Sequence, residues 1–194
     1  MAANIIGISG TDASGKDTVG QMLAERHNWL FVSVSEILRD ELRQRNVPLE
    51  RKNLRELSAQ WRRQHGLGVL VDKAVQQFHR SGGRHKYQGL VIASLRHPGE
   101  AARLQELGGR VVWTDADPKV RYRRIVARNR GTEDQVSFDE FLAEEQAQMK
   151  PSGDEATLSL SGVKERADIF IVNDGNDTEA FKNQAEKKLA KFIN

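Results

Sequence analysis

A glycine-rich stretch near the amino terminus, GTDASGKDT at residues 10–18, limits the folds open to this 194-residue chain more than any other feature. The apolar run Ile5–Ile8 before it predicts a buried strand, and apolar residues recur at helical spacing from Val19 to Leu23 after it. A glycine-rich turn between a strand and a helix directs backbone N–H groups and the positive end of the helix at one spot. The stretch therefore predicts a phosphate-binding loop within a layered α/β fold.

Each type of residue in this loop has an expected role. Glycines at positions 10 and 15 permit unusual backbone conformations and a close approach to phosphate, and Lys16 supplies a positive charge. Asp17 follows the lysine, where a hydroxyl usually holds Mg²⁺, and the hydroxyl comes next at Thr18. Asp17 is therefore a candidate metal contact through water, or a residue that caps the first helical turn. The residues expected to bind ATP here are Gly10, Asp12, Ala13, Ser14, Gly15, Lys16, Asp17 and Thr18.

Apolar runs alternate with helical patterns along the rest of the chain. Further strands are predicted at 29–32, 90–93, 110–113 and 168–172, with helices between them. This order predicts a single domain, residues 1–194, with a five-stranded parallel sheet flanked by helices. Residues of about 46–83 are expected to form a helical insert that binds an acceptor, and about 128–166 a lid with a flexible loop at Pro151–Gly162.

Composition excludes several classes of protein. The chain has no cysteine, so a disulfide framework and a cysteine-based zinc site are excluded. Its five histidines are scattered and have no acidic partner at ligand spacing, and a net charge of +3 does not by itself imply nucleic-acid binding. No apolar run approaches the roughly 20 residues of a membrane span. We therefore expect a cytoplasmic protein that is a monomer or a homodimer and does not bind membranes.

Two arginines are placed to bind an anionic second substrate. Arg39 follows the second predicted strand and Arg96 follows the third, and the carboxyl ends of parallel strands converge near the phosphate loop. Arginine offers a planar fork for phosphate, so Arg39 and Arg96, with Ser35 beside them, are the candidate acceptor site. The alternative is that each arginine is an ordinary surface residue.

A third group of arginines follows the fourth strand. Arg124 and Arg128 lie four residues apart on one helical face, and Arg130 lies where that helix is expected to end. They fit a lid that closes over a transferring phosphoryl group, neutralises its charge and excludes water. A solvated basic helix face is the alternative, and nucleic-acid binding by this cluster is a weaker one.

Taken together, these segments resemble the nucleoside monophosphate kinase group of P-loop kinases. VSVSEILR at 32–39 is similar to the acceptor-arginine segment of adenylate kinases, Ser94–Arg96 to their Phe-Pro-Arg, and Arg124–Arg128 to the base of their lid. Residues 167–175 resemble the ending of dephospho-coenzyme A kinases and of an uncharacterised archaeal kinase-like family, which implies that Asn173 and Gly175 lie near the adenine of ATP.

The resemblance implies a P-loop NTPase fold of the nucleotide kinase type, with ATP and Mg²⁺ as cofactors and Lys16, Arg96, Arg124 and Arg128 in catalysis. The implied partner is a small phosphorylated acceptor, in particular a nucleoside or deoxynucleoside monophosphate. Dephospho-coenzyme A or another phosphorylated metabolite is an alternative acceptor. A catalytically reduced, nucleotide-binding regulatory protein is an alternative function.

Two departures from the family pattern bear on the chemistry. The third strand ends in Ala93-Ser94, where an acidic residue often orders Mg²⁺, so Asp12, Asp17 or Asp115 would have to replace it. No Asp follows the second strand, which leaves Glu36 as the one candidate base for a hydroxyl acceptor. A phosphate acceptor is already ionised and needs positioning and charge neutralisation instead. The sequence therefore favours a phosphorylated acceptor, without identifying its base or sugar or choosing between ATP and GTP.

Overall fold

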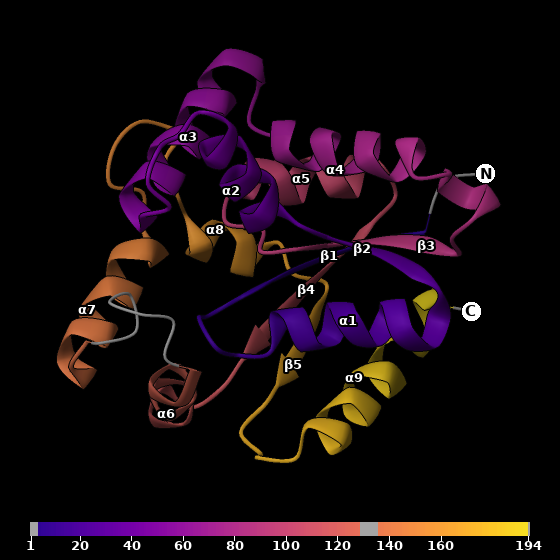
Figure 1. Cartoon of the computed structure of the whole chain (residues 1–194). Coiled ribbons are helices and arrows are strands. Elements are labelled where there is room, and N and C mark those ends of the chain that lie inside the picture. Colours follow the sequence, from indigo (N-terminus) through magenta and orange to yellow (C-terminus); the bar gives the residue numbers. More distant parts are fainter. Residues whose placement is uncertain (1–3, 129–135, 194) are drawn as a thin grey trace.

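The computed structural model describes residues 4–128 and 136–193 and contains the predicted parallel sheet (Figure 1). Its strands are β1 (Ile5–Gly10), β2 (Trp29–Ser33), β3 (Gly89–Ala93), β4 (Arg110–Asp115) and β5 (Ile169–Val172), in the spatial order β2-β3-β1-β4-β5. All pairs are parallel, and every residue of β1 and β3 is buried, as expected for central strands covered on both faces. The fold class predicted from the sequence is confirmed.

Helices cover both faces of the sheet. On one face lie α1 (Lys16–His27) and α9 (Thr178–Ile193), whose residues Leu23 and Leu189 are fully buried against the sheet. The other face is covered by α2 (Val34–Gln44), α3 (Arg51–His65), α4 (Val69–Arg80), α5 (Pro98–Glu106) and α8 (Leu160–Glu165). A short 3₁₀ helix, η1 (Gly83–His85), leads into β3.

Two further helices lie at the carboxyl end of the sheet, far from both chain termini (Figure 1). They are α6 (Pro118–Arg128) and α7 (Phe138–Met149). Asp117 caps α6 by accepting hydrogen bonds from the N–H groups of Lys119 and Val120. Ser137 and Glu140 form the predicted capping box of α7. Arg130 and the predicted hinge beside it lie outside the described residues.

The prediction of a flexible loop at Pro151–Gly162 was partly wrong. The helix α8 begins inside it at Leu160, with the Ser159 hydroxyl capping its first turn, and Ala156 and Leu160 are buried. The Ser159 N–H also donates to the carbonyl of Arg96 at 3.1 Å. Residues 151–155 are exposed, whereas the part from Ala156 to Leu160 is packed and is tied by Ser159 to the segment after β3.

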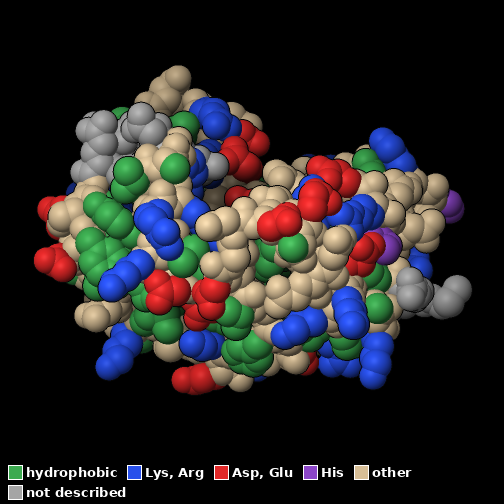
Figure 2. Space-filling view, turned by 90° about the horizontal axis from the view of Figure 1, so that it is seen from below, with side chains coloured by type: hydrophobic (Ala, Val, Ile, Leu, Met, Phe, Trp, Pro, Cys, Tyr) green, Lys and Arg blue, Asp and Glu red, His purple; other side chains and the backbone are tan. Residues whose placement is uncertain are grey.

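On the face that includes α1 and α9, acidic and basic side chains are interspersed (Figure 2). Of the arginines of α6, Arg121 is buried and ion-paired with Glu145 of α7, whereas Arg123 and Arg128 are exposed. Among the described residues, no helix is long and apolar enough to cross a bilayer.

Candidate functional site

The loop between β1 and α1 adopts a conformation that requires its glycines. Gly10 and Gly15 have φ angles of 146° and 100°, in the region that favours glycine. A Cβ at Gly10 would lie 2.0 Å from the carbonyl oxygen of Thr114 on β4. The Ser14 hydroxyl donates to the Thr11 carbonyl at 2.8 Å and so closes the turn. The backbone therefore forms a compact loop at the amino end of α1, as a phosphate-binding role requires.

Lys16 begins α1 and turns back over this loop. Its ammonium donates to the Thr11 carbonyl at 2.6 Å, and the residue is 8% exposed. Burial lowers the pKa of Lys16 to about 8, although the nearby Asp12 carboxylate acts in the opposite direction. A phosphate group placed in the loop would add a negative charge that further stabilises this ammonium.

Asp12 is the residue of the loop whose side chain reaches the candidate acceptor site. Its carboxylate accepts a hydrogen bond from the Arg96 guanidinium at 3.0 Å. Burial by itself would raise the pKa of Asp12, but Arg96, Lys16 and Arg51 outweigh it and hold the pKa well below its usual range. Asp12 is thus an ionised carboxylate at the junction of the two predicted half-sites.

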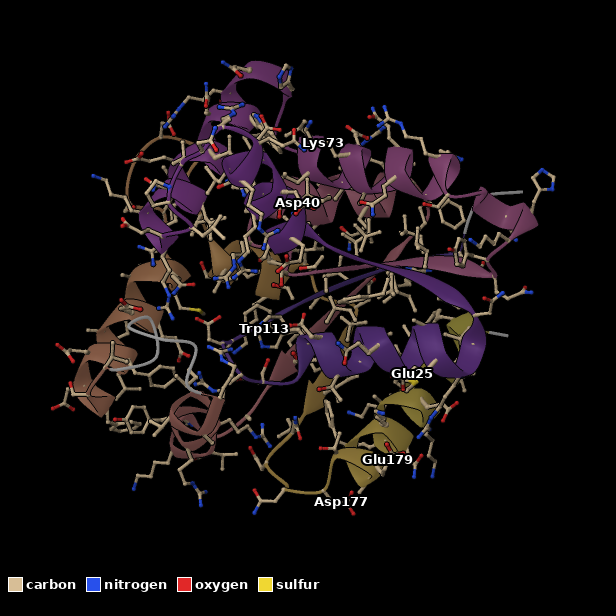
Figure 3. All side chains as sticks on the ribbon, viewed as in Figure 1. Glu25, Asp40, Lys73, Trp113, Asp177 and Glu179 are labelled. Atoms are coloured by element: carbon tan, nitrogen blue, oxygen red, sulfur yellow. The ribbon has the colours of Figure 1, made fainter. Side chains whose placement is uncertain are left out.

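Most of the predicted site residues line one cavity of about 750 Å³, whereas Gly10 and Ser14 do not line it. Its walls include Lys16 and Thr18 from the loop, Arg39 from α2 and Arg96 from the end of β3. The loop before α9 forms another wall, and Asp177 from that loop lies at the lower edge of Figure 3. The other predicted residues that line the cavity are Asp12, Ala13, Gly15, Asp17, Ser35, Arg124, Arg128, Asn173 and Gly175.

The phosphate loop and the loop after β5 form one side of this cavity, called the donor side below. Arg124 holds these two segments together. Its guanidinium donates to the carbonyl oxygens of Ala13, Asn173 and Gly175 at 3.2, 3.0 and 2.5 Å. Burial lowers the pKa of Arg124. The Asn173 amide in turn donates to the Ser14 carbonyl at 3.0 Å, so the loop after β5 is tied to the phosphate loop. Arg124 therefore lies against the donor side here and not above an open cavity.

The acceptor side contains arginines that the sequence analysis missed. Arg39 pairs with Glu36 at 2.7 Å, and Arg96 also contacts Gln148 of α7. Three arginines of α3 line the same cavity: Arg51, Arg55 and Arg62. With Ser58 they recur at helical spacing, which is the sequence signal that could have identified them.

The acids near the loop differ in their suitability for Mg²⁺. Asp17 is exposed on the first turn of α1 and lines the cavity. Asp115 accepts a hydrogen bond from the Thr11 hydroxyl at 2.8 Å and lies 3.7 Å from the ammonium of Lys164. Within 4–128 and 136–193, no group of three or more acidic or histidine side chains could hold a metal by itself. These residues fit Mg²⁺ bound mainly through phosphate oxygens, with one or two carboxylates beside it.

One of the five histidines has a structural role that its sequence spacing did not reveal. His97 is buried and caps α5, where its Nδ1 accepts a hydrogen bond from the Gly99 N–H. Its Nε2 lies 2.6 Å from the carbonyl of Glu155. Burial and the nearby Arg62 lower the pKa of His97, which favours the neutral ring that this arrangement needs.

Comparison with known proteins gives a matching family and several relatives. The model of a family described as AAA domain matches residues 6–148, well over half of the chain. Curated relatives include UPF0200 proteins of Methanococcus maripaludis, 26% identical over 98% of both chains, and of Saccharolobus islandicus, 28% identical over 96% of this chain and 93% of the relative.

Solved structures of kinases share the fold. Shikimate kinase from Bacteroides thetaiotaomicron is 15% identical, with a TM-score of 0.60 over 96% of this chain and 98% of the other. Dephospho-CoA kinase from Campylobacter jejuni is 16% identical, with a TM-score of 0.54 over 97% and 96%. At these identities the likeness establishes a P-loop kinase fold and leaves the substrate open.

Proposed function

The chain belongs to the AAA domain family, and from its kinase-like P-loop fold we propose that it is an ATP-dependent phosphotransferase. The observation that carries the proposal is one cavity that is lined both by the phosphate loop and by Arg39 of α2 and Arg96 after β3. The Asp12–Arg96 contact lies where the two halves meet. Such a cavity fits two anionic substrates placed end to end.

In the proposed reaction the γ-phosphoryl group of ATP moves to the acceptor. Backbone N–H groups of 10–15 and the Lys16 ammonium hold the β- and γ-phosphates, and the Thr18 hydroxyl holds the α-phosphate. The amide of Asn173 lies beside the nucleotide. Mg²⁺, when bound, would neutralise phosphate charge, and Asp17 and Asp12, which line the cavity, are the candidate carboxylates beside it. Arg128 and Arg130 belong to a proposed lid at about 128–166.

The favoured acceptor is a nucleoside or deoxynucleoside monophosphate. Arg39 and Arg96 would bind its phosphate, and α3 belongs to the proposed acceptor insert at about 46–83. The cavity wall adds three more arginines and includes the apolar residues Phe31, Leu38 and Leu54, which suit a base or another flat organic group. This combination of cations and apolar surface supports an organic phosphate over a simple sugar.

A hydroxyl acceptor is the second candidate, and Asp12 is the observation that favours it. The sequence indicated Glu36 as the candidate base, whereas in the structure Asp12 contacts Arg96 at the junction of the half-sites. Its pKa is well below its usual range, however, so it would accept a proton weakly and would chiefly orient a hydroxyl.

A panel of acceptors tests both candidates. Purified protein with Mg²⁺ and either ATP or GTP is incubated with nucleoside and deoxynucleoside monophosphates, dephospho-coenzyme A, shikimate and gluconate. Release of diphosphate is measured, and products are identified by mass spectrometry. Transfer to a monophosphate that disappears in Lys16→Met supports the proposal, with a loss of about 100-fold or more. Tight ATP binding without any phosphorylated product would instead support a regulatory nucleotide-binding protein.

A further inference from the structure

One carboxylate outside the reacting centre holds the backbone that carries Arg96. Glu100 lies in the first turn of α5 and is 0% exposed. Its Oε2 accepts hydrogen bonds from the N–H groups of Arg96 at 2.8 Å and His97 at 3.2 Å. A capping box needs only the second of these bonds, so the bond to Arg96 is an additional constraint.

The other oxygen of Glu100 connects this strand end to the acceptor insert. The Arg62 guanidinium of α3 donates to Oε1 twice, with Nη2 at 2.8 Å and Nε at 3.1 Å. Its Nη1 donates to the Ala156 carbonyl at 2.9 Å. The Arg62 side chain is only 1% exposed, yet the residue still lines the cavity. Four segments therefore meet at one ion pair: α3, the end of β3, α5 and the loop before α8.

Stability alone does not explain this ion pair. Removing two charges from water costs free energy that their attraction only partly restores, and a well-packed apolar pair of similar volume is often at least as stable. An ion pair with directional hydrogen bonds does fix geometry. Here the carbonyl of Arg96 is bound as well, by the Ser159 N–H, so the peptide groups on both sides of this residue are held.

We propose that Glu100 and Arg62 are positioning residues for the acceptor: they fix Arg96 at the end of β3 and couple that position to helix α3. This inference rests on the proposed function, because it takes Arg96 to be the group that binds the acceptor phosphate. The ligand that Arg96 would bind is the acceptor's phosphate dianion, placed between α3 and the end of β3. Neither residue needs to touch the γ-phosphoryl group.

The test uses inorganic phosphate as a probe, so that it does not depend on the identity of the acceptor. The donor site is first saturated with Mg²⁺ and a non-hydrolysable ATP analogue, and phosphate binding is then measured by calorimetry. Glu100→Gln places an amide against either the Arg96 N–H or the Arg62 guanidinium. We expect phosphate affinity to fall about tenfold, the scale of a lost hydrogen bond to a charged group. Affinity for the ATP analogue should change less than about twofold.

Asp72→Asn is the matched control. Asp72 of α4 pairs with Arg103 of α5 at 2.9 Å, so it too links α5 to the preceding helices, but at a half-exposed site away from the strand end. It should leave both affinities unchanged. If Glu100→Gln does not fold, Arg62→Lys replaces it, because this variant keeps the charge but cannot reach both Glu100 and Ala156. A several-fold loss of phosphate affinity is then expected.

Arg96→Ala separates failure of this inference from failure of the proposed function. Should Arg96→Ala weaken phosphate binding while Glu100→Gln, or its replacement, does not, the positioning role is wrong and the acceptor role of Arg96 stands. If Arg96→Ala has no effect, its acceptor role is wrong and the positioning role falls with it. Equal losses of phosphate and ATP-analogue affinity in Glu100→Gln would indicate general disruption and would also overturn the inference.

Discussion

Lys16 is expected to stabilise nucleotide binding at the expense of the unliganded fold. Its ammonium is buried, and burial lowers its pKa from the ordinary 10.5 to about 8. At about 1.36 kcal/mol for each pKa unit, this lowering means that the charged form inside the loop costs the folded state about 3 kcal/mol of stability at pH 7. Lys16→Met keeps the side-chain stem and removes that charge.

The net gain in Lys16→Met should be smaller than this figure. The variant also loses the hydrogen bond to the Thr11 carbonyl, which costs about 1 kcal/mol, and leaves Asp12 with less compensating positive charge. We therefore expect the unliganded variant to be more stable than the wild type by about 1 kcal/mol at pH 7. Urea unfolding of both proteins, followed by circular dichroism, measures this difference.

The pH dependence provides the stronger test of the reasoning. A lysine whose folded pKa is lowered binds fewer protons in the folded than in the unfolded state at pH values between about 8 and 10.5. The stability of the wild type should therefore rise relative to the variant across this window. The stability advantage of the Lys16→Met variant over the wild type should shrink by about 1 kcal/mol between pH 7 and 9. An advantage that stays constant with pH, or a variant less stable at pH 7, would refute the explanation by burial of charge.

Three further substitutions test single contacts. Arg96→Ala should raise the acceptor KM about tenfold or more while the ATP KM changes little, because Arg96 is the proposed acceptor-phosphate ligand; equal effects on both would contradict this. Asn173→Ala should lower the free energy of unfolding by about 1–3 kcal/mol and raise the ATP KM, since the buried Ser14 carbonyl loses its donor. Ser137→Ala should cost about 1 kcal/mol in urea unfolding by removing the capping hydroxyl of α7, with Ser152→Ala as a control.

Local signals account for most of what the sequence predicted correctly. The strand, glycine turn and helix around Gly10 are encoded within about 20 neighbouring residues, and so are the helix starts at Asp117-Pro118 and Ser137. Alternation of such elements then restricts the sheet to right-handed parallel connections. The parts that were missed depend on distant partners. Strand β4 continues through Thr114 and Asp115 because these polar residues pair with β5, which lies more than 50 positions away in the chain.

The charge network of the site shows the same limit and changes the chemical argument. Asp12 and Arg96 are separated by 84 positions, and nothing in the sequence near either one indicates that they form an ion pair. Once paired, Asp12 offers Arg96 a carboxylate where an acceptor phosphate would otherwise bind. A phosphate dianion must therefore compete with Asp12, whereas a hydroxyl beside that phosphate could donate to it. For the proposed phosphotransferase, this contact would suit an acceptor that presents both an anionic group and a nearby hydroxyl, as the phosphate and sugar of a nucleotide do.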